Sequence, residues 1–165
     1  MEKSVEVKDH IMSMQEDNYV SNPNCEIIEY LRNYFHIEKQ DLRTYSPLTL
    51  AYIGDGIYDI IIRTIIVTKK NAPVNRLHKE VSQLVKANAQ MRMIHAIESI
   101  LTEEELGIYK RGRNAKSFTS AKNASITEYR IATGLEALIG YLYLDNRFNR
   151  IVELIEYGIN HLDKE

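Results

Sequence analysis

Two carboxylates stand in long, mostly apolar stretches of the sequence and are the first candidates for chemistry. Asp55 lies among isoleucines, and Glu136 lies among leucine, alanine and isoleucine. A lone buried carboxylate is costly unless it is paired, hydrogen-bonded or bound to a cation. No basic residue lies within one helical turn of either acid, and two hard oxygen ligands from facing helices would suit Mg²⁺. We therefore predict that Asp55 and Glu136 are catalytic residues that bind a metal ion, provided that the two stretches meet.

A simpler alternative for such acids is an ion pair or a capped side chain. It is the favoured interpretation for Asp59, because Arg63 follows it at the four-residue spacing of neighbours on a helix.

Glycines flank both candidate metal ligands. Gly54 and Gly56 surround the first acid, and Gly134 and Gly140 lie close to the second. Glycine inside a helix costs roughly 1 kcal/mol relative to alanine, so it often marks a close approach of two helices or of a ligand. Tolerated core glycines are an equally common explanation.

Charge is distributed unevenly along the chain. Residues 109–130 hold six basic residues and one acidic residue, whereas residues 1–30 hold seven acidic and two basic residues. The formal net charge of -2 therefore sums two opposed blocks and does not exclude a nucleic-acid partner. Donors in the basic block could bind phosphates, although a run of charge is more often a solvated surface. The predicted RNA-binding residues are His78, Lys79, Lys110, Arg111, Arg113, Asn114, Lys116 and Lys122.

Three prolines mark the starts of helices that would position these residues. Pro23, Pro47 and Pro73 each precede an apolar pattern with helical spacing, and proline at the first helical position loses no needed hydrogen bond. Ser46 is the expected N-cap of a long buried helix from Pro47. The segment after Pro73 is either one long helix or two helices broken near Asn88.

Capping signals mark the remaining helices. Thr102, followed by three glutamates, fits a capping box; Ser125 or Thr127 is expected to cap the helix that carries Glu136; and Asn146 is expected to open the last helix. Residues 111–125 are rich in Gly, Ser, Asn and basic residues without periodicity, so we expect a loop there. No strand or repeat stands out, and the predicted fold class is all-α.

Length and composition bound the domain organisation. The 165 residues fit one domain, and a hydrophobic content of 44% is too high for a disordered chain. Residues 1–20 show little periodicity and are expected to form an acidic N-terminal arm, with the folded domain over residues 21–165. Cys25 is a single cysteine, the N-terminus lacks the order of a secretion signal, and the apolar stretches are too short to span a bilayer. We expect a soluble, cytoplasmic protein.

The acidic stretches and the basic block together resemble the ribonuclease III family. The run YIGDGIYD (residues 52–59) resembles the signature helix of its catalytic domains, and LEALIG (residues 135–140) with YLD (residues 143–145) resembles its second acidic motif. The RGRNAK segment (residues 111–116) lies between them in the order typical of the Mini-ribonuclease III subfamily, short bacterial proteins without a double-stranded-RNA-binding domain. The resemblance runs over residues 48–144.

By position, the resemblance makes Asp55 the catalytic aspartate and Glu136 the metal-binding glutamate. The larger family has two further acids, at positions that are Ala51 and Thr133 here, so the number of metal ions stays open. The resemblance implies a homodimeric all-α endonuclease that uses Mg²⁺, with Mn²⁺ as a substitute, to cut double-stranded RNA. The subfamily is associated with maturation of precursor 23S ribosomal RNA. The RGRNAK segment would then supply contacts that other members obtain from the missing domain.

Two other functions stay open from the sequence. The missing acids could leave an RNA-binding pseudo-nuclease that does not cut. A purely structural helical dimerisation module would instead show no salt-dependent affinity for RNA. A cleavage assay with metal separates the enzyme from both.

Overall fold

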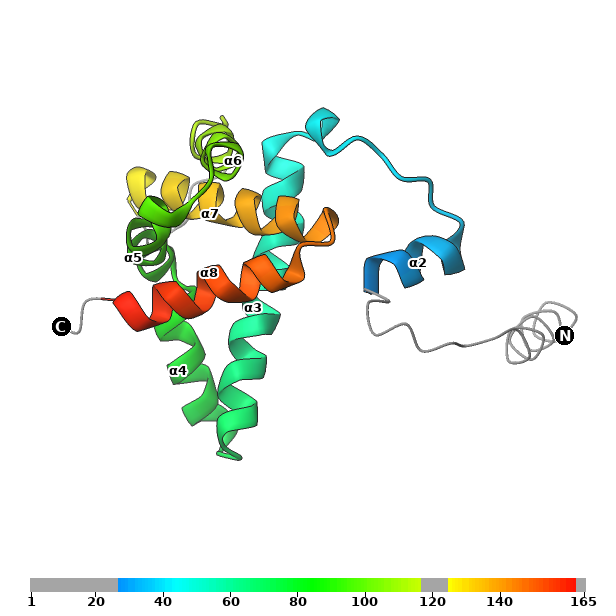
Figure 1. The fold of residues 1–165 in the computed structure, drawn as a ribbon. Coiled ribbons are helices and arrows are strands. Elements are labelled where there is room, and N and C mark those ends of the chain that lie inside the picture. Colours follow the sequence, from blue (N-terminus) through cyan, green and yellow to red (C-terminus); the bar gives the residue numbers. More distant parts are fainter. Residues whose placement is uncertain (1–26, 117–124, 163–165) are drawn as a thin grey trace, which may run out of the picture. The chain divides into compact units, whose positions relative to one another are not determined.

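The computed structural model describes residues 27–116 and 125–162, and every regular element in these two ranges is a helix (Figure 1). The predicted all-α class is confirmed. The chain divides into two compact units, residues 1–39 and residues 40–165. In the first unit, α2 (Ile27–Phe35) is an amphipathic helix on which the rings of Tyr30 and Tyr34 stack. The predicted helix start at Pro23, Cys25 and the predicted arm over residues 1–20 lie outside the described residues.

The second unit carries the remaining helices. In chain order they are a 3₁₀ turn at Leu42–Thr44, α3 (Pro47–Lys69), α4 (Val74–Val85), α5 (Ala87–Ile97), a 3₁₀ turn at Glu98–Ile100, α6 (Glu103–Arg113), α7 (Ile126–Leu144) and α8 (Phe148–His161). Helix α7 packs against α3, α5, α6 and α8, and it runs across α3 in Figure 1. The sequence of α7 is apolar on most faces, and most of its residues are accordingly buried against these neighbours. Over the described residues, no helix is both long and apolar enough to cross a membrane.

Helix starts follow the local capping signals. The hydroxyl of Ser46 accepts a hydrogen bond from the backbone N–H of Thr49 at 3.0 Å. Thr102 and Ser125 each form a complete capping box with the glutamate three residues later. These bonds satisfy backbone donors that a helix leaves open in its first turn, so the predicted caps are confirmed.

Two boundaries differ from those expected. The segment after Pro73 forms two helices, and the break lies at Lys86, whose backbone is extended (φ -66°, ψ 151°), rather than at Asn88. The last helix begins after Arg147 instead of at Asn146. Asn146 adopts a left-handed φ of 59°, a conformation that asparagine tolerates and that ends the preceding helix.

The expectation of a loop from residue 111 is wrong for its first three residues. Helix α6 continues to Arg113, and Asn114 is its C-cap. Acidic residues in the first turn and basic residues in the last turn complement the helix dipole, and the buried Ile108 and Tyr109 anchor the helix to its neighbours. The basic residues therefore belong to a regular, packed helix.

A buried carboxylate ties α6 to α8. Glu105 is fully buried and accepts hydrogen bonds from Nε of Arg150 at 2.9 Å, from Nη2 of Arg147 at 3.1 Å and from the backbone N–H of Thr102 at 2.9 Å. Burial by itself would raise the pKa of Glu105, but the hydrogen bonds from Arg150 and Thr102 bring that pKa below its ordinary value. The charge is thus compensated, and the cluster fixes the start of α6.

Candidate active site

Helices α3 and α7 cross at glycines, so their backbones come into direct contact. A Cβ atom on Gly54 would overlap the backbone carbonyl oxygen of Glu136 and would lie 2.7 Å from the backbone nitrogen of Gly140. A Cβ atom on Gly140 would in turn overlap the carbonyl oxygen of Leu50. Only residues without a side chain permit this approach, and the close helix contact suggested by the flanking glycines is confirmed.

The crossing brings Asp55 and Glu136 close enough for their charges to interact. Glu136 is partly buried, and its pKa is raised to about 7, first by burial and then by the negative charge of Asp55. Asp55 is exposed rather than buried as the sequence suggested, and partial loss of hydration, with the charge of Asp59, raises its pKa. Two acids from distant parts of the sequence therefore lie within range of each other's charge, one exposed and one partly buried.

Asp59 has a different role from these two acids. Nη2 of Arg63 donates to Oδ1 of Asp59 at 3.1 Å, and Nε of Arg63 donates to the other carboxylate oxygen. The expected ion pair at four-residue spacing is confirmed, and this carboxylate is already compensated by the protein.

A third polar side chain, which the sequence did not single out, affects the pKa of Glu136. Gln90 in α5 is 2% exposed, and its hydrogen bond with the Glu136 carboxylate lowers the pKa of Glu136 against the two effects that raise it. The only signal in the sequence is a glutamine on the buried face of an amphipathic helix, beside Ala89 and Met93. Such a position says nothing about which residue lies opposite.

The residues at the crossing fit a small divalent cation. No group of three or more His, Cys, Asp or Glu side chains gathers in a metal-binding arrangement within the described ranges, so the candidate site depends on two carboxylates. Among nearby polar atoms, Oε1 of Gln90 in α5, a helix packed on α7, is buried and has no hydrogen-bond partner. Mg²⁺ prefers such oxygens and keeps several of its own waters, and a dication would relieve the repulsion between the two acids.

The two positions that carry further acids in the larger family are occupied here by buried residues without a carboxylate. Ala51 and Thr133 are each 5% exposed, and the Thr133 hydroxyl donates to the carbonyl of Tyr129 on its own helix at 3.0 Å. Neither residue supplies a carboxylate, so an ion at the crossing would keep more water.

The last turn of α6 carries three of the predicted RNA-binding residues. Lys110 and Arg111 are exposed, and Nη2 of Arg111 donates to the carbonyl of Tyr45, just before α3, at 3.1 Å. The guanidinium of Arg113 lies 5.6 Å from the centre of the Tyr109 ring. This cation–π contact and the Tyr45 contact direct the basic turn to the surface beside the start of α3.

The other predicted RNA-binding residues follow this turn, lie on another helix or fall outside the described ranges. Asn114 and Lys116 are exposed directly after α6, His78 and Lys79 are exposed on α4, and Lys122 is outside the described residues. Helix α4 lies along the C-terminal half of α3, whereas α6 lies beside its N-terminal half (Figure 1). The structure thus separates the α4 residues from the basic turn.

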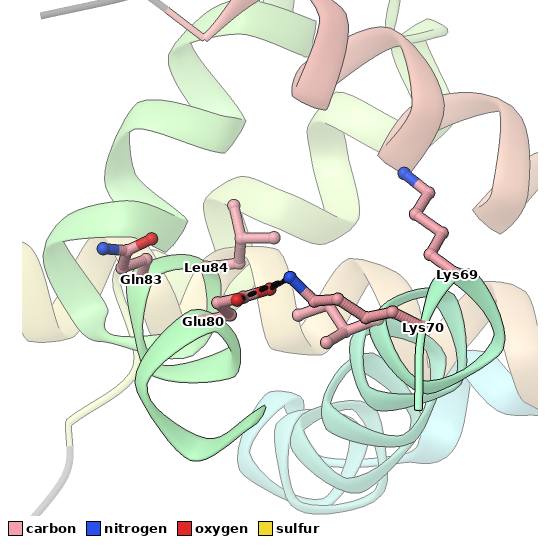
Figure 2. Close-up of a pocket in the computed structure, with 6 residues that line it drawn as sticks. Lys69, Lys70, Glu80, Gln83 and Leu84 are labelled. Atoms are coloured by element: carbon pink, nitrogen blue, oxygen red, sulfur yellow. Dashed lines mark hydrogen bonds and ion pairs between the residues drawn. The ribbon is translucent and has the colours of Figure 1, made fainter. Parts of the chain in front are cut away.

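A pocket at the C-terminal end of α3 does not contain the candidate acids. It is lined by Ile66, Lys69, Lys70, Glu80, Gln83 and Leu84. Figure 2 shows Lys70 reaching across to Glu80, with 2.6 Å between Nζ and Oε1. Two of its charges neutralise each other within the protein, and the chemistry is better placed at the α3–α7 crossing.

Known protein families show similarity to the region that contains the α3–α7 crossing and helix α6. The family described as the ribonuclease III domain matches residues 48–147, which include both acids and the basic turn of α6. The chain therefore belongs to the ribonuclease III family and is an endoribonuclease.

Its curated relatives carry the name Mini-ribonuclease 3. One from Clostridium tetani is 54% identical over 134 residues, which cover 79% of this chain and 89% of the relative. One from Thermoanaerobacter sp. is 45% identical over 135 residues, which cover 82% of this chain and 95% of the relative. A crystal structure of a protein from Fusobacterium nucleatum aligns with a TM-score of 0.66 and 35% identity, covering 73% of this chain and 97% of that chain.

Proposed function

We propose that the protein is an Mg²⁺-dependent endoribonuclease that cleaves double-stranded RNA and matures precursor 23S ribosomal RNA. Mn²⁺ is the expected substitute metal. The observation that supports the proposal is the close backbone contact of α3 and α7 at Gly54 and Gly140, across which the charge of Asp55 raises the pKa of Glu136. The ribosomal substrate is supported by the resemblance to the Mini-ribonuclease III subfamily.

Asp55 and Glu136 are the residues that would hold the metal. When bound, a divalent cation would supply a Lewis acid that activates water and stabilises the leaving oxygen. Glu136 is partly buried, whereas Asp55 lies at the surface, where a phosphodiester can approach. The chain thus offers one partly buried and one exposed carboxylate.

The basic residues would hold the RNA backbone. Lys110, Arg111, Arg113 and Lys116 extend from the last turn of α6 to just beyond it, and they are joined in this proposal by Asn114, Lys122, His78 and Lys79. Contacts of this type read the phosphates and shape of a duplex more than its sequence. We therefore expect weak base specificity from the protein itself.

Helix α3 offers a surface for a homodimer. Tyr52, Ile60 and Val67 are 85%, 55% and 52% exposed, which is unusual for large apolar side chains on one helix. A second copy covering this face would give a dimer with one acid pair per subunit. Sedimentation of the wild-type chain and of Ile60→Glu tests this, with dimer expected for the first and monomer for the second.

Cleavage of a structured RNA tests the proposed site. Asp55→Asn is expected to abolish Mg²⁺-dependent cleavage while duplex binding persists, and Asp59→Asn, on the same helix but paired with Arg63, is the matched control. Full activity in Asp55→Asn would refute the assignment. Duplex binding by the wild type without metal-dependent strand breaks would favour the pseudo-nuclease instead.

A further inference from the structure

Helix α6 crosses α7 at a second pair of glycines, close to the crossing of α3. A Cβ atom on Gly112 would lie 2.6 Å from Cβ of Ala137 and 3.0 Å from the carbonyl oxygen of Thr133. A Cβ atom on Gly134 would lie 2.6 Å from Cε2 of Tyr109. Glycine weakens a helix, and close packing explains its presence in the last turn of α6. The basic turn of α6 is therefore packed directly on α7.

Neighbouring residues of α7 contact the acid-bearing helix and the basic turn. Gly54 in α3 lies against the backbone carbonyl of Glu136. Gly112 in α6 lies against the side chain of Ala137, which is the next residue of α7. Packed helices transmit small displacements because the interior between them is nearly incompressible. The position of the basic turn relative to the two acids is thus set at one place on α7.

Two of the proposed RNA-binding residues flank Gly112 in the sequence. Arg111 is tied to the carbonyl of Tyr45 by a hydrogen bond of 3.1 Å, and the guanidinium of Arg113 lies 5.6 Å from the centre of the Tyr109 ring. Both side chains are therefore anchored to the fold near the start of α3 or on α6 itself. Their placement depends on where α6 lies on α7, whereas their charge does not.

We propose that Gly112 is a positioning residue for RNA cleavage, an inference that rests on the proposed function. Because Gly112 has no side chain, the basic turn lies at the separation from Asp55 and Glu136 that brings a phosphodiester of the bound duplex to the two acids. The affinity for RNA follows from the charges of the turn, whereas the rate of cleavage follows from its placement. A displacement of about 1 Å can lower a rate about 100-fold without changing any reacting group.

Gly112→Ala tests the proposal because it displaces the turn and leaves every charge in place. Cleavage of duplex RNA at saturating substrate and Mg²⁺ gives kcat, and duplex titrations in EDTA at several salt concentrations give the affinity and its salt slope. We expect Gly112→Ala to lower kcat by about 10–100-fold and to leave the affinity and the slope unchanged. Gly107→Ala is the matched control, because it lies exposed on the same helix and an added Cβ meets nothing within 4 Å. This control should keep the wild-type values.

A compensating change on α7 separates displacement of the turn from general damage to the fold. Ala137→Gly removes the atom nearest to the new methyl group, so the double variant Gly112→Ala/Ala137→Gly should recover part of the lost kcat. Its kcat should stay below the wild-type value, because the two contacts at 3.0 Å with the backbone of α7 remain. If Gly112→Ala alone does not fold, the kcat of this double variant is the test.

The outcomes distinguish this inference from the proposed function. A wild type that cleaves, with a folded Gly112→Ala of equal kcat, overturns the role of Gly112 and leaves the proposed function standing. Wild-type kcat in the double variant has the same meaning if Gly112→Ala alone does not fold. A loss of kcat in Gly112→Ala that Ala137→Gly does not relieve at all also overturns the inference, because the α6–α7 contact is then not its cause. A wild type that does not cleave RNA with Mg²⁺ overturns both.

Discussion

The backbone of Gly54 lies so close to the carbonyl of Glu136 that no methyl group fits between them. Gly54 precedes Asp55, so the contact that joins α3 to α7 also sets the distance between the two acids. Stability and site geometry thus depend on the same residue.

Substitution of Gly54 should therefore be far more damaging than substitution of its neighbour. Gly54→Ala forces the two helices apart, and overpacking of this kind costs about 1–3 kcal/mol or more in the free energy of unfolding. Gly56→Ala meets nothing within 4 Å and should stabilise the helix by roughly 0.5–1 kcal/mol. Urea denaturation at one fixed protein concentration measures both. Equal effects at the two positions would contradict the described crossing.

Glu136 should make the metal-free protein less stable as the pH rises. Its pKa is raised in the folded chain from 4.5 to about 7, so its favourable contribution is complete below about pH 4.5 and is lost as the pH passes 7. Glu136→Gln, which stays neutral, should match the wild type near pH 4.5 and exceed its free energy of unfolding above pH 7 by about 1–3 kcal/mol. Unfolding in EDTA across this range provides the measurement, with the exposed Glu156→Gln on α8 as control. A difference that does not vary with pH would count against the raised pKa.

Charge reversal on α6 should change the salt dependence of RNA binding. The double variant Arg111→Glu/Arg113→Glu is expected to weaken binding to duplexes of any sequence, and each lost phosphate contact should reduce the slope of log affinity against log salt by about 1. Lys69→Glu, exposed at the other end of α3, is the control. Duplex titrations in EDTA at several salt concentrations measure the slope. An unchanged slope in the double variant would place the RNA-binding surface elsewhere.

Loss of Arg150 should expose the cost of the buried Glu105 carboxylate. Arg150→Met removes two hydrogen bonds to Glu105 and one to the carbonyl of Ile100. Leaving a buried charge without any partner costs about 3–5 kcal/mol, and we expect a loss at or below the lower end of this range because Arg147 still pairs with Glu105. Arg43→Met breaks an exposed pair with Asp41 that solvent screens, and it should lower the free energy of unfolding far less. Thermal or urea unfolding distinguishes them. If the weaker compensation of the Glu105 charge, then left to Arg147 and Thr102, is the cause, adding Glu105→Gln to Arg150→Met should restore part of the lost stability.

The sequence predicted what depends on neighbours along the chain. Ser46, Thr102 and Ser125 cap helices because each acts on backbone groups within three residues, and the Asp59–Arg63 pair forms across one helical turn. The sequence could mark Asp55 and Glu136 as uncompensated acids, and the flanking glycines suggested close packing. Contact between α3 and α7, which are far apart in the sequence, could be seen only in the structure.

The sequence failed where distant contacts decide the outcome. Residues 111–113 looked irregular because Gly112 and polar residues interrupt the pattern, yet the cap at Thr102 and the buried Tyr109 keep α6 helical through them. Gln90 gave no signal, because a glutamine on an apolar face does not reveal the carboxylate opposite it. Asp55 was taken as buried since its neighbours are apolar, although its own side of α3 reaches the surface.

Helix α6 has a consequence for how a polyanion would be held. The Glu105 cluster fixes its first turn, and Ile108 and Tyr109 pack its middle against the fold, so Lys110 and Arg111 project from a backbone that is already ordered. Ordering a free segment at the moment of binding costs about 1–2 kcal/mol of conformational entropy per residue. In α6 this ordering takes place during folding. An anionic ligand that binds this turn would therefore contact donors whose spacing is already fixed, without the entropy loss of ordering the segment.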